Sequence, residues 1–90
     1  MIKIATDIYT LNIPARIRNV LVKNGYKSVE QLTEDFEKEP LLYKFLDGVG
    51  KTMTAKIAHA LSDFHGTDRY ADMFLYLAIS ENKKHSRHLF

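Results

Sequence analysis

Residues 45–61, FLDGVGKTMTAKIAHAL, combine a glycine-rich turn with the start of a helix. Gly48 and Gly50 allow the backbone to turn tightly and to approach a ligand closely. The turn opens into a helix N-terminus, where unpaired N–H groups and the positive end of the helix dipole attract anions. Lys51 adds a full positive charge at that point. At an exposed, shallow site of this kind, the anion that we expect is a nucleic-acid phosphate.

Apolar residues recur at helical spacing on both sides of this turn, which predicts an all-α fold. We expect a compact bundle of about five short helices, at about residues 14–24, 28–39, 40–46, 51–63 and 67–80. The side chains expected to face the core from the last two helices are Ala55, Ile57, Ala58, Leu61, Phe64, Tyr70, Met73, Phe74 and Leu77.

The ends of the first two helices carry typical signals. Pro14 suits a first helical position, because its missing N–H has no intrahelical acceptor there. Gly25 accepts the left-handed conformation that ends a helix. Ser28 and Gln31 have the spacing of a capping box, and the residue before Pro40 is disfavoured in helical geometry. These local signals agree with the hydrophobic spacing, which strengthens the all-α prediction.

The two ends of the chain leave less regular patterns. Ile2, Ile4, Ile8 and Leu11 suit either an extended lead-in or short strand, or a segment that becomes helical near residues 6–7. We expect residues 1–82 to form one helical domain and residues 83–90 to form a flexible basic tail.

The composition is that of an ordered domain without disulfides. The chain has 90 residues, of which 46% are hydrophobic and 27% charged, and it contains no cysteine. This length leaves room for one modest core and little room for an enclosed catalytic cavity. The N-terminus lacks the apolar core of a signal peptide, and no apolar stretch approaches the ~20 residues that cross a bilayer. We therefore expect a cytoplasmic protein without membrane association.

Charged residues are segregated along the chain, although the formal net charge is only +2. Arg16, Arg18, Lys23 and Lys27 make residues 12–28 basic, whereas the next ten or so residues are mostly acidic. Such segregation is typical of a basic contact face with an acidic back. Two ordinary solvated helix faces would produce the same pattern.

The glycine turn and the helix after it resemble the helix-hairpin-helix motif, whose form is h-x-G-h-G-x-x-x-A-x-x-I. Most of this pattern is filled, by Leu46, Gly48, Val49, Gly50, Ala55 and Ile57. Ile57 follows Ala55 by two residues instead of three. The resemblance implies sequence-independent binding of the DNA backbone through the hairpin amides. A plain glycine-rich turn between two packed helices is the alternative.

A second resemblance covers about residues 8–62. Residues 11–23, LNIPARIRNVLVK, are similar to the first DNA-contacting helix of the C-terminal domain of the bacterial RNA polymerase α subunit, which carries L-x-V-R-x-x-N-x-L. The matching positions hold Ile13, Ala15, Arg16, Asn19 and Leu21. The resemblances imply a SAM-like, helix-hairpin-helix fold. The helix predicted at about residues 68–80 lies beyond them and is an extra C-terminal helix.

In that family the arginine enters the minor groove of A/T-rich DNA, the asparagine supports it, and the glycine-lysine turn holds a flanking phosphate. A narrow A/T groove concentrates negative potential and favours arginine. Together, the resemblances imply a DNA-binding site made of Arg16, Asn19, Gly48, Gly50, Lys51 and Thr52. Arg18 lies about 200° around the helix from Arg16, so we expect it to be solvated.

The chain departs from the family pattern at three places. Pro14 stands where the family prefers a serine or threonine cap. Thr52 and Met53 replace a common lysine-serine pair, and Lys56 replaces an acidic residue. A phosphate contact that is weaker or shifted follows from these changes.

Other kinds of site fit the sequence poorly. A nucleotide-binding phosphate loop needs a glycine six residues before its lysine, where this chain has Phe45, and a buried strand before it. His85 and His88 lie in the predicted tail, and we expect His59 and His65 to be partly exposed helix residues. We expect no catalytic residues, metal, cofactor or small-molecule substrate.

The favoured hypothesis is a non-enzymatic module that binds double-stranded DNA in transcription regulation, of bacterial or phage type. It would contact the minor groove, with A/T-rich DNA as the candidate, and the phosphate backbone. The alternative is a protein-interaction module on the same fold that docks on RNA polymerase or another regulator. The small net charge favours the alternative, and the fold alone does not decide.

Overall fold

The computed structural model describes residues 5–87, and the side chains of residues 5–81. Its elements, in chain order, are η1 (Ile8–Thr10), α1 (Ala15–Lys23), α2 (Val29–Lys38), η2 (Leu42–Lys44), α3 (Lys51–His65) and α4 (Arg69–Arg87). The elements η1 and η2 are single turns of 3₁₀ helix. Within the described range there is no strand, and Asp7 and Ser28 form an isolated bridge. The predicted all-α class is confirmed, with four α-helices instead of five.

Helices α1 and α2 begin and end close to where the sequence predicts. The Ser28 hydroxyl accepts a hydrogen bond from Gln31 N at 3.2 Å, and Gln31 Oε1 accepts one from Ser28 N at 3.2 Å. Glu39 is extended, with φ −145°, because Pro40 follows it, and α2 ends there. Gly25 ends the first helical segment with φ +94°. Pro14, predicted as the first helical residue, is instead the residue before α1, with ψ 148° and no side-chain cap. Local signals therefore mark both ends of α2 and the end of α1.

The predicted helix at residues 40–46 is wrong, because the chain there forms only the single turn η2. Leu41 precedes that turn with φ −85° and ψ 75°, outside helical geometry. Leu41, Leu42 and Leu46 are nevertheless buried, whereas Phe45 is 47% exposed. The short segment between Pro40 and the glycine turn buries its leucines from an irregular backbone, so tertiary packing overrides helical spacing there.

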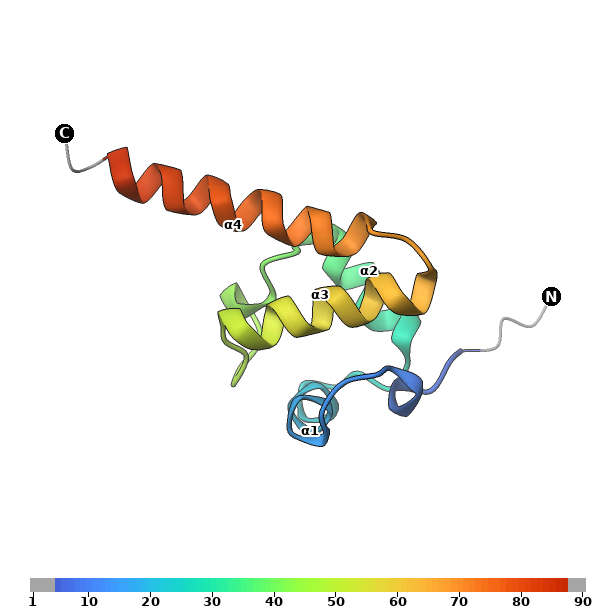
Figure 1. Cartoon of the computed structure of the whole chain (residues 1–90). Coiled ribbons are helices and arrows are strands. Elements are labelled where there is room, and N and C mark those ends of the chain that lie inside the picture. The colour runs from blue at the N-terminus through green and yellow to red at the C-terminus, as the bar shows by residue number, and fades with distance from the viewer. Residues whose placement is uncertain (1–4, 88–90) are drawn as a thin grey trace.

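Helices α3 and α4 pack against each other (Figure 1). Gly66, with φ +67°, ends α3. Helix α4 continues to Arg87, so the predicted end near Ser80 is wrong and the helix enters the predicted tail. Residues 81–87, ENKKHSR, contain no glycine or proline and several good helix formers, which explains the extension. The remainder of the predicted tail, residues 88–90, lies outside the described residues.

One hydrophobic core joins all the elements. Its largest fully buried side chains are Phe36, Leu11, Leu21, Leu32, Leu42, Ile57 and Leu61. Tyr70 is buried and Phe74 packs against the core, as predicted. The prediction that Phe64 faces the core is wrong, because its side chain is exposed. Phe64 lies in the last turn of α3, where its ring packs edge-on against the His65 ring. Among the described helices, none has the length and apolar character needed to cross a lipid bilayer.

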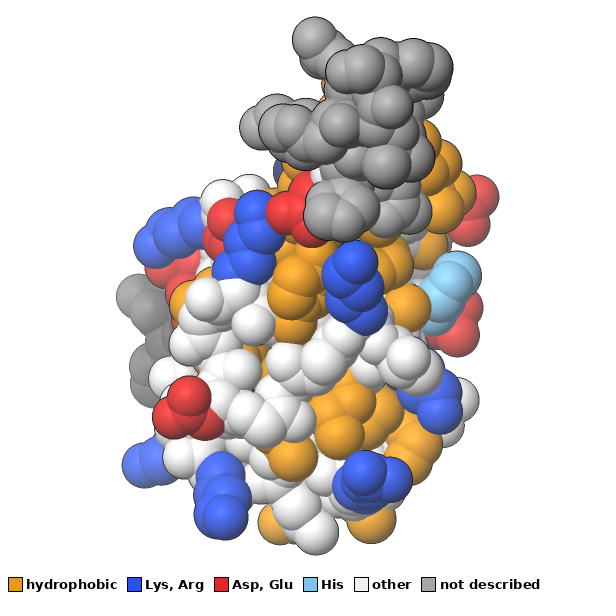
Figure 2. Space-filling view, turned by 90° about the vertical axis from the view of Figure 1, so that its left-hand side faces the viewer, with side chains coloured by type: hydrophobic (Ala, Val, Ile, Leu, Met, Phe, Trp, Pro, Cys, Tyr) orange, Lys and Arg blue, Asp and Glu red, His pale blue; other side chains and the backbone are white. Residues whose placement is uncertain are grey.

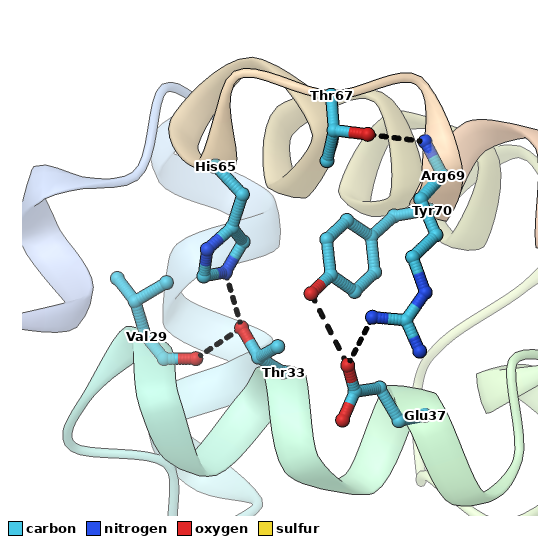
Figure 3. Close-up of polar contacts among 7 residues, drawn as sticks. All are labelled: Val29, Thr33, Glu37, His65, Thr67, Arg69 and Tyr70. Carbon is cyan, nitrogen blue, oxygen red and sulfur yellow. Dashed lines mark hydrogen bonds and ion pairs between the residues drawn. The ribbon is translucent and has the colours of Figure 1, made fainter.

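Polar contacts fix the junction of α2, α3 and α4 (Figure 3). His65 Nε2 lies 3.0 Å from Thr33 Oγ1, whose hydroxyl donates to Val29 O at 2.8 Å. Because the Thr33 proton is used in that bond, the His65 ring donates through Nε2. The Tyr70 hydroxyl donates to Glu37 Oε2 at 3.2 Å. These contacts attach the end of α3 and the start of α4 to α2. They thereby help to orient α4 relative to the other helices.

The N-terminal segment is held against the start of α2. Thr6 donates through its backbone N to Glu30 Oε1 at 2.7 Å and through its hydroxyl to Glu30 Oε2 at 2.8 Å. Ile8 and Leu11 are buried, and Ile8 begins η1. Each sequence interpretation holds in part, because Asp7 is extended and bridges to Ser28, and the chain becomes helical only in the single turn η1 that follows. Residues 2 and 4 lie outside the described residues.

Candidate nucleic-acid interface

One face of α1 carries exposed polar side chains. Arg16, Asn19 and Lys23 are spaced by three and four residues, so they share this face. Their side chains have no hydrogen-bond or ion-pair partner in the part of the chain that the structure describes. The other side of α1 is anchored by Ile17 and Leu21, which are buried in the core. Helix α1 is therefore fixed to the core on one side and exposes these polar groups to solvent on the other.

The glycine turn lies against the same helix. Gly48 has φ +79°, a conformation that favours glycine. A Cβ atom at Gly48 would lie 3.5 Å from Val20 Cγ1, so the turn backbone packs directly on α1. Asn24 Nδ2 donates to Asp47 O at 3.0 Å and fastens the end of α1 to the turn. The structure in this way brings together two segments that the sequence singled out separately.

A shallow hollow of about 430 Å³ opens between the helix and the turn. It is lined by Val20, Lys23, Asn24, Asp47 and Gly48. Lys23 is absent from the site that the resemblances imply, although its position seven residues after Arg16 indicates the same helix face. Asp47 brings a negative charge to the hollow, so its charge is mixed.

Helix α3 begins without a side-chain cap. Gly50, the residue before it, is extended with φ −103° and ψ −175°, a conformation open to any residue. No described atom lies within 4 Å of a Cβ placed at Gly50. Neither backbone geometry nor packing therefore explains the glycine. The first N–H groups of a helix have no intrahelical acceptor, and the first turn of α3 contains no acidic residue. This helix start is open to an external anion.

Lys51 and Thr52 are both exposed in the first turn of α3. The Lys51 ammonium lies 5.8 Å from the centroid of the Tyr43 ring. Its charge therefore lies on the η2 side of the helix start. Thr52 makes no described contact that would compete with a ligand.

Glu81 of α4 brings negative charge to the same end of α3. Its carboxylate accepts a hydrogen bond from the Tyr43 hydroxyl at 2.7 Å and pairs with Lys44 Nζ at 2.6 Å. The hydrogen bonds with Lys44 and Tyr43 lower the pKa of Glu81, and the charge of Lys51 contributes. Desolvation and the bond to Glu81 raise the pKa of Tyr43 to about 12. The positive charge of Lys51 would therefore attract both a phosphate at the α3 start and the Glu81 carboxylate.

The assignment of Ala55 to the motif's alanine position is wrong. Counted from Gly50, that position falls at Thr54, and the isoleucine position falls at Ile57. Thr54 and Ile57 are fully buried, whereas Ala55 is half-buried. The Thr54 hydroxyl donates to Gly50 O at 2.9 Å, so a threonine can occupy this buried position.

Arg18 is not solvated, in contrast to the sequence expectation. It is half-buried, its Nη2 donates to Ile13 O at 3.2 Å, and its guanidinium lies 5.1 Å from the centroid of the Tyr9 ring. The chain before α1 folds back over this side of the helix, which spacing within α1 does not reveal. Arg18 attaches η1 to α1, whereas Arg16 faces solvent.

The surface view combines these features (Figure 2). Lys and Arg side chains are scattered over both the upper and the lower parts of this face. Acidic side chains lie mostly at its edges and towards α4. Charges of both signs therefore occur on this surface of the fold.

Comparison of the chain with known protein families, curated proteins and solved structures finds no match. Across the described residues, no three His, Asp or Glu side chains converge as a metal site requires. His59 and His65 are exposed, and the side chains of His85 and His88 lie outside the described part of the molecule.

Proposed function

We propose that this domain is a non-enzymatic module that binds double-stranded DNA. Helix α1 contacts an A/T-rich minor groove, and the start of α3 contacts the phosphate backbone. One observation carries the proposal: the face of α1 with Arg16 and Asn19 lies beside the turn that leads into an uncapped helix N-terminus. A groove-reading arginine and a phosphate-binding helix start are thereby available on one surface.

Arg16 has the properties that a groove contact requires. It is exposed and engages no described carboxylate, so it enters a groove without breaking an ion pair. The negative potential of a narrow A/T groove attracts its guanidinium. Asn19, one turn further along the helix, can bond a base edge or a sugar oxygen. Lys23, on the same face, adds a charge for a phosphate.

The start of α3 has the properties that a phosphate contact requires. Its first amides and the helix dipole favour an anion, and Gly50 leaves the approach free of side-chain atoms. Lys51 and Thr52 add a charge and a hydroxyl at the same turn. The resemblance to the C-terminal domain of the RNA polymerase α subunit supports this division between α1 and α3. It also supports a role in transcription regulation of bacterial or phage type.

A protein-interaction module that docks on RNA polymerase or another regulator is the second candidate. Phe45 is 47% exposed and Asp47 is exposed, and both flank the glycine turn. An exposed aromatic beside a carboxylate suits a protein partner better than a phosphate.

Fluorescence anisotropy with labelled A/T-rich and G/C-rich duplexes at two salt concentrations tests the proposal. The variant is Arg16→Ala, and the control is Lys38→Ala, which removes the same charge from an exposed site on α2. We expect wild-type affinity to prefer the A/T-rich duplex and to fall with salt. Arg16→Ala should lower the affinity about tenfold, whereas Lys38→Ala should change it little.

Two results would overturn DNA binding. One is that wild-type protein fails to bind either duplex at low salt. The other is that Arg16→Ala and Lys38→Ala lower the affinity equally, as non-specific charge attraction would require. Either result makes the protein-interaction module the better candidate for the same face.

A further inference from the structure

Helix α4 has an apolar outer face that no described element covers. Leu75, Tyr76 and Ile79 are 55%, 71% and 46% exposed. Their spacing places them together on one side of the helix, opposite Tyr70 and Phe74, which pack on the core. In Figure 1 the bundle lies on one side of α4 and no element lies on the other.

Around Leu75, Tyr76 and Ile79, helix α4 carries apolar side chains on both sides, but only the side with Tyr70 and Phe74 packs on the core. A helix that is hydrophobic all round is normally enclosed by other elements, and a contiguous exposed apolar patch usually marks an interaction site. None of the three side chains belongs to the hydrophobic core of a single chain. The outer face of α4, defined by Leu75, Tyr76 and Ile79, is therefore available for a partner.

We propose that the outer face of α4 pairs with the same face of a second copy of this chain, with the two helices antiparallel. The charges of α4 are complementary to themselves in this arrangement. Asp68 and Asp72 stand at its beginning, and Lys83, Lys84 and Arg87 stand in its last turns. Asp72 is exposed and has no ion-pair partner among the described residues. Antiparallel helix dipoles add to the attraction.

The helical register fits a two-fold axis. Asp72 and Lys83 are eleven residues apart, or about three turns of helix. An axis midway between them lies also midway between Tyr76 and Ile79. Each Tyr76 then meets the partner's Ile79 region, and each Asp72 meets the basic end of the other helix. An isologous contact of this kind closes at two copies.

The dimer that this face supports is weak. The contact uses a single helix from each copy, which places it at the small end of specific interfaces. We expect a dissociation constant in about the micromolar to millimolar range. The inference is independent of DNA binding, because it uses none of the residues of the α1 face or the α3 start.

Sedimentation velocity of the full chain tests the pairing, from about ten micromolar to about one millimolar. Ile79→Glu is the test variant and Val22→Glu is its matched control. Both replace a β-branched side chain of similar exposure, 46% and 43%, and Val22 lies on α1. Wild type and Val22→Glu should approach the mass of two chains, and Ile79→Glu should remain at one. Circular dichroism checks that both variants keep their helices.

Three outcomes overturn the proposal. In the first, wild type stays at the mass of one chain at every concentration, and the outer face of α4 would then bind a different protein. Alternatively, Ile79→Glu and Val22→Glu associate alike, which places the contact elsewhere. A mass that grows beyond two chains contradicts a closed pair.

Charge reversal tests the antiparallel direction. Asp72→Lys should weaken the dimer roughly tenfold, because a symmetric dimer loses two favourable pairs. Adding Lys83→Asp in the same chain should restore most of the affinity. A doubly reversed variant that associates no better than Asp72→Lys alone overturns the antiparallel arrangement.

Discussion

Helices α2 and α3 begin in opposite ways. The start of α2 is closed by the capping box of Ser28 and Gln31, and Glu30 lies in its first turn. The start of α3 has Gly50 before it, no side-chain cap and no acidic residue in its first turn. One chain thus contains both a closed and an open helix start. The open start is not a requirement of the backbone, because a serine can adopt the conformation of Gly50.

The surroundings of the two helix starts explain the difference. The start of α2 is covered by the N-terminal segment, where Val29 N donates to Thr6 O at 2.8 Å and Ser28 is only 6% exposed. The amides at the start of α2 therefore donate hydrogen bonds to groups within the protein. The start of α3 faces solvent beside the α1 face and the glycine turn. The fold thus satisfies one helix start internally and leaves the other exposed to solvent.

Closing the α3 start should have the largest effect on DNA binding. In Gly50→Asp the new carboxylate caps the free amides and repels a phosphate. We expect DNA affinity at low salt to fall tenfold or more, because a phosphate contact is replaced by repulsion. Stability should stay constant or rise by about 0.5–1 kcal/mol. Anisotropy and urea unfolding measure the two quantities.

Thr67→Asp is the control for this prediction. It introduces the same charge at the start of α4, where the Thr67 hydroxyl accepts a hydrogen bond from Arg69 N at 3.2 Å and a carboxylate can do the same. Its DNA affinity should remain close to wild type. An equal loss in both variants would mean that net charge alone governs binding.

Opening the α2 start should affect stability and leave DNA binding intact. Ser28→Ala removes the hydroxyl that accepts from Gln31 N. We expect the free energy of unfolding to fall by about 1 kcal/mol, as measured by urea denaturation. The DNA affinity of the folded variant should be unchanged. If Ser28→Ala weakens DNA binding as much as Gly50→Asp does, the distinction between the two helix starts fails.

The smallest expected effect concerns the acid near the α3 start. The pKa of Glu81 is lowered in the folded protein, chiefly by Lys44, so its ion pair stabilises the fold above the ordinary glutamate range of about 4. This contribution is lost as the pH falls through the lowered pKa. An NMR pH titration should show Glu81 titrating below its ordinary range in wild type and closer to that range in Lys44→Ala. Identical titration in both proteins would contradict the assigned cause.

The parts of the fold that follow from the sequence are set by neighbouring residues. Ser28 with Gln31, Glu39 before Pro40, and Gly25 act on the backbone beside them, and the structure agrees at each. The helix predicted at residues 40–46 does not form, because burial of its leucines in the core overrides helical spacing.

The sequence predicts the two segments of the candidate site but not that they lie side by side. The sequence patterns single out the α1 residues and the glycine turn separately. Their adjacency depends on the Asn24–Asp47 bond and on the contact of Gly48 with Val20, which are tertiary. Arg18 shows the same limit, because the segment that folds over it is Tyr9 and its neighbours, outside the helix.

In the proposed complex, one DNA duplex engages both the α1 face and the open start of α3. An NMR titration of ¹⁵N-labelled protein with a short A/T-rich duplex, beside Gly50→Asp, tests it most directly. We predict that wild-type shifts cluster at Arg16, Asn19 and the amides of residues 51–53. In Gly50→Asp the shifts at residues 51–53 should disappear. If those amides do not respond in wild type at low salt and excess DNA, the open helix start does not bind phosphate and DNA binding through this surface is contradicted.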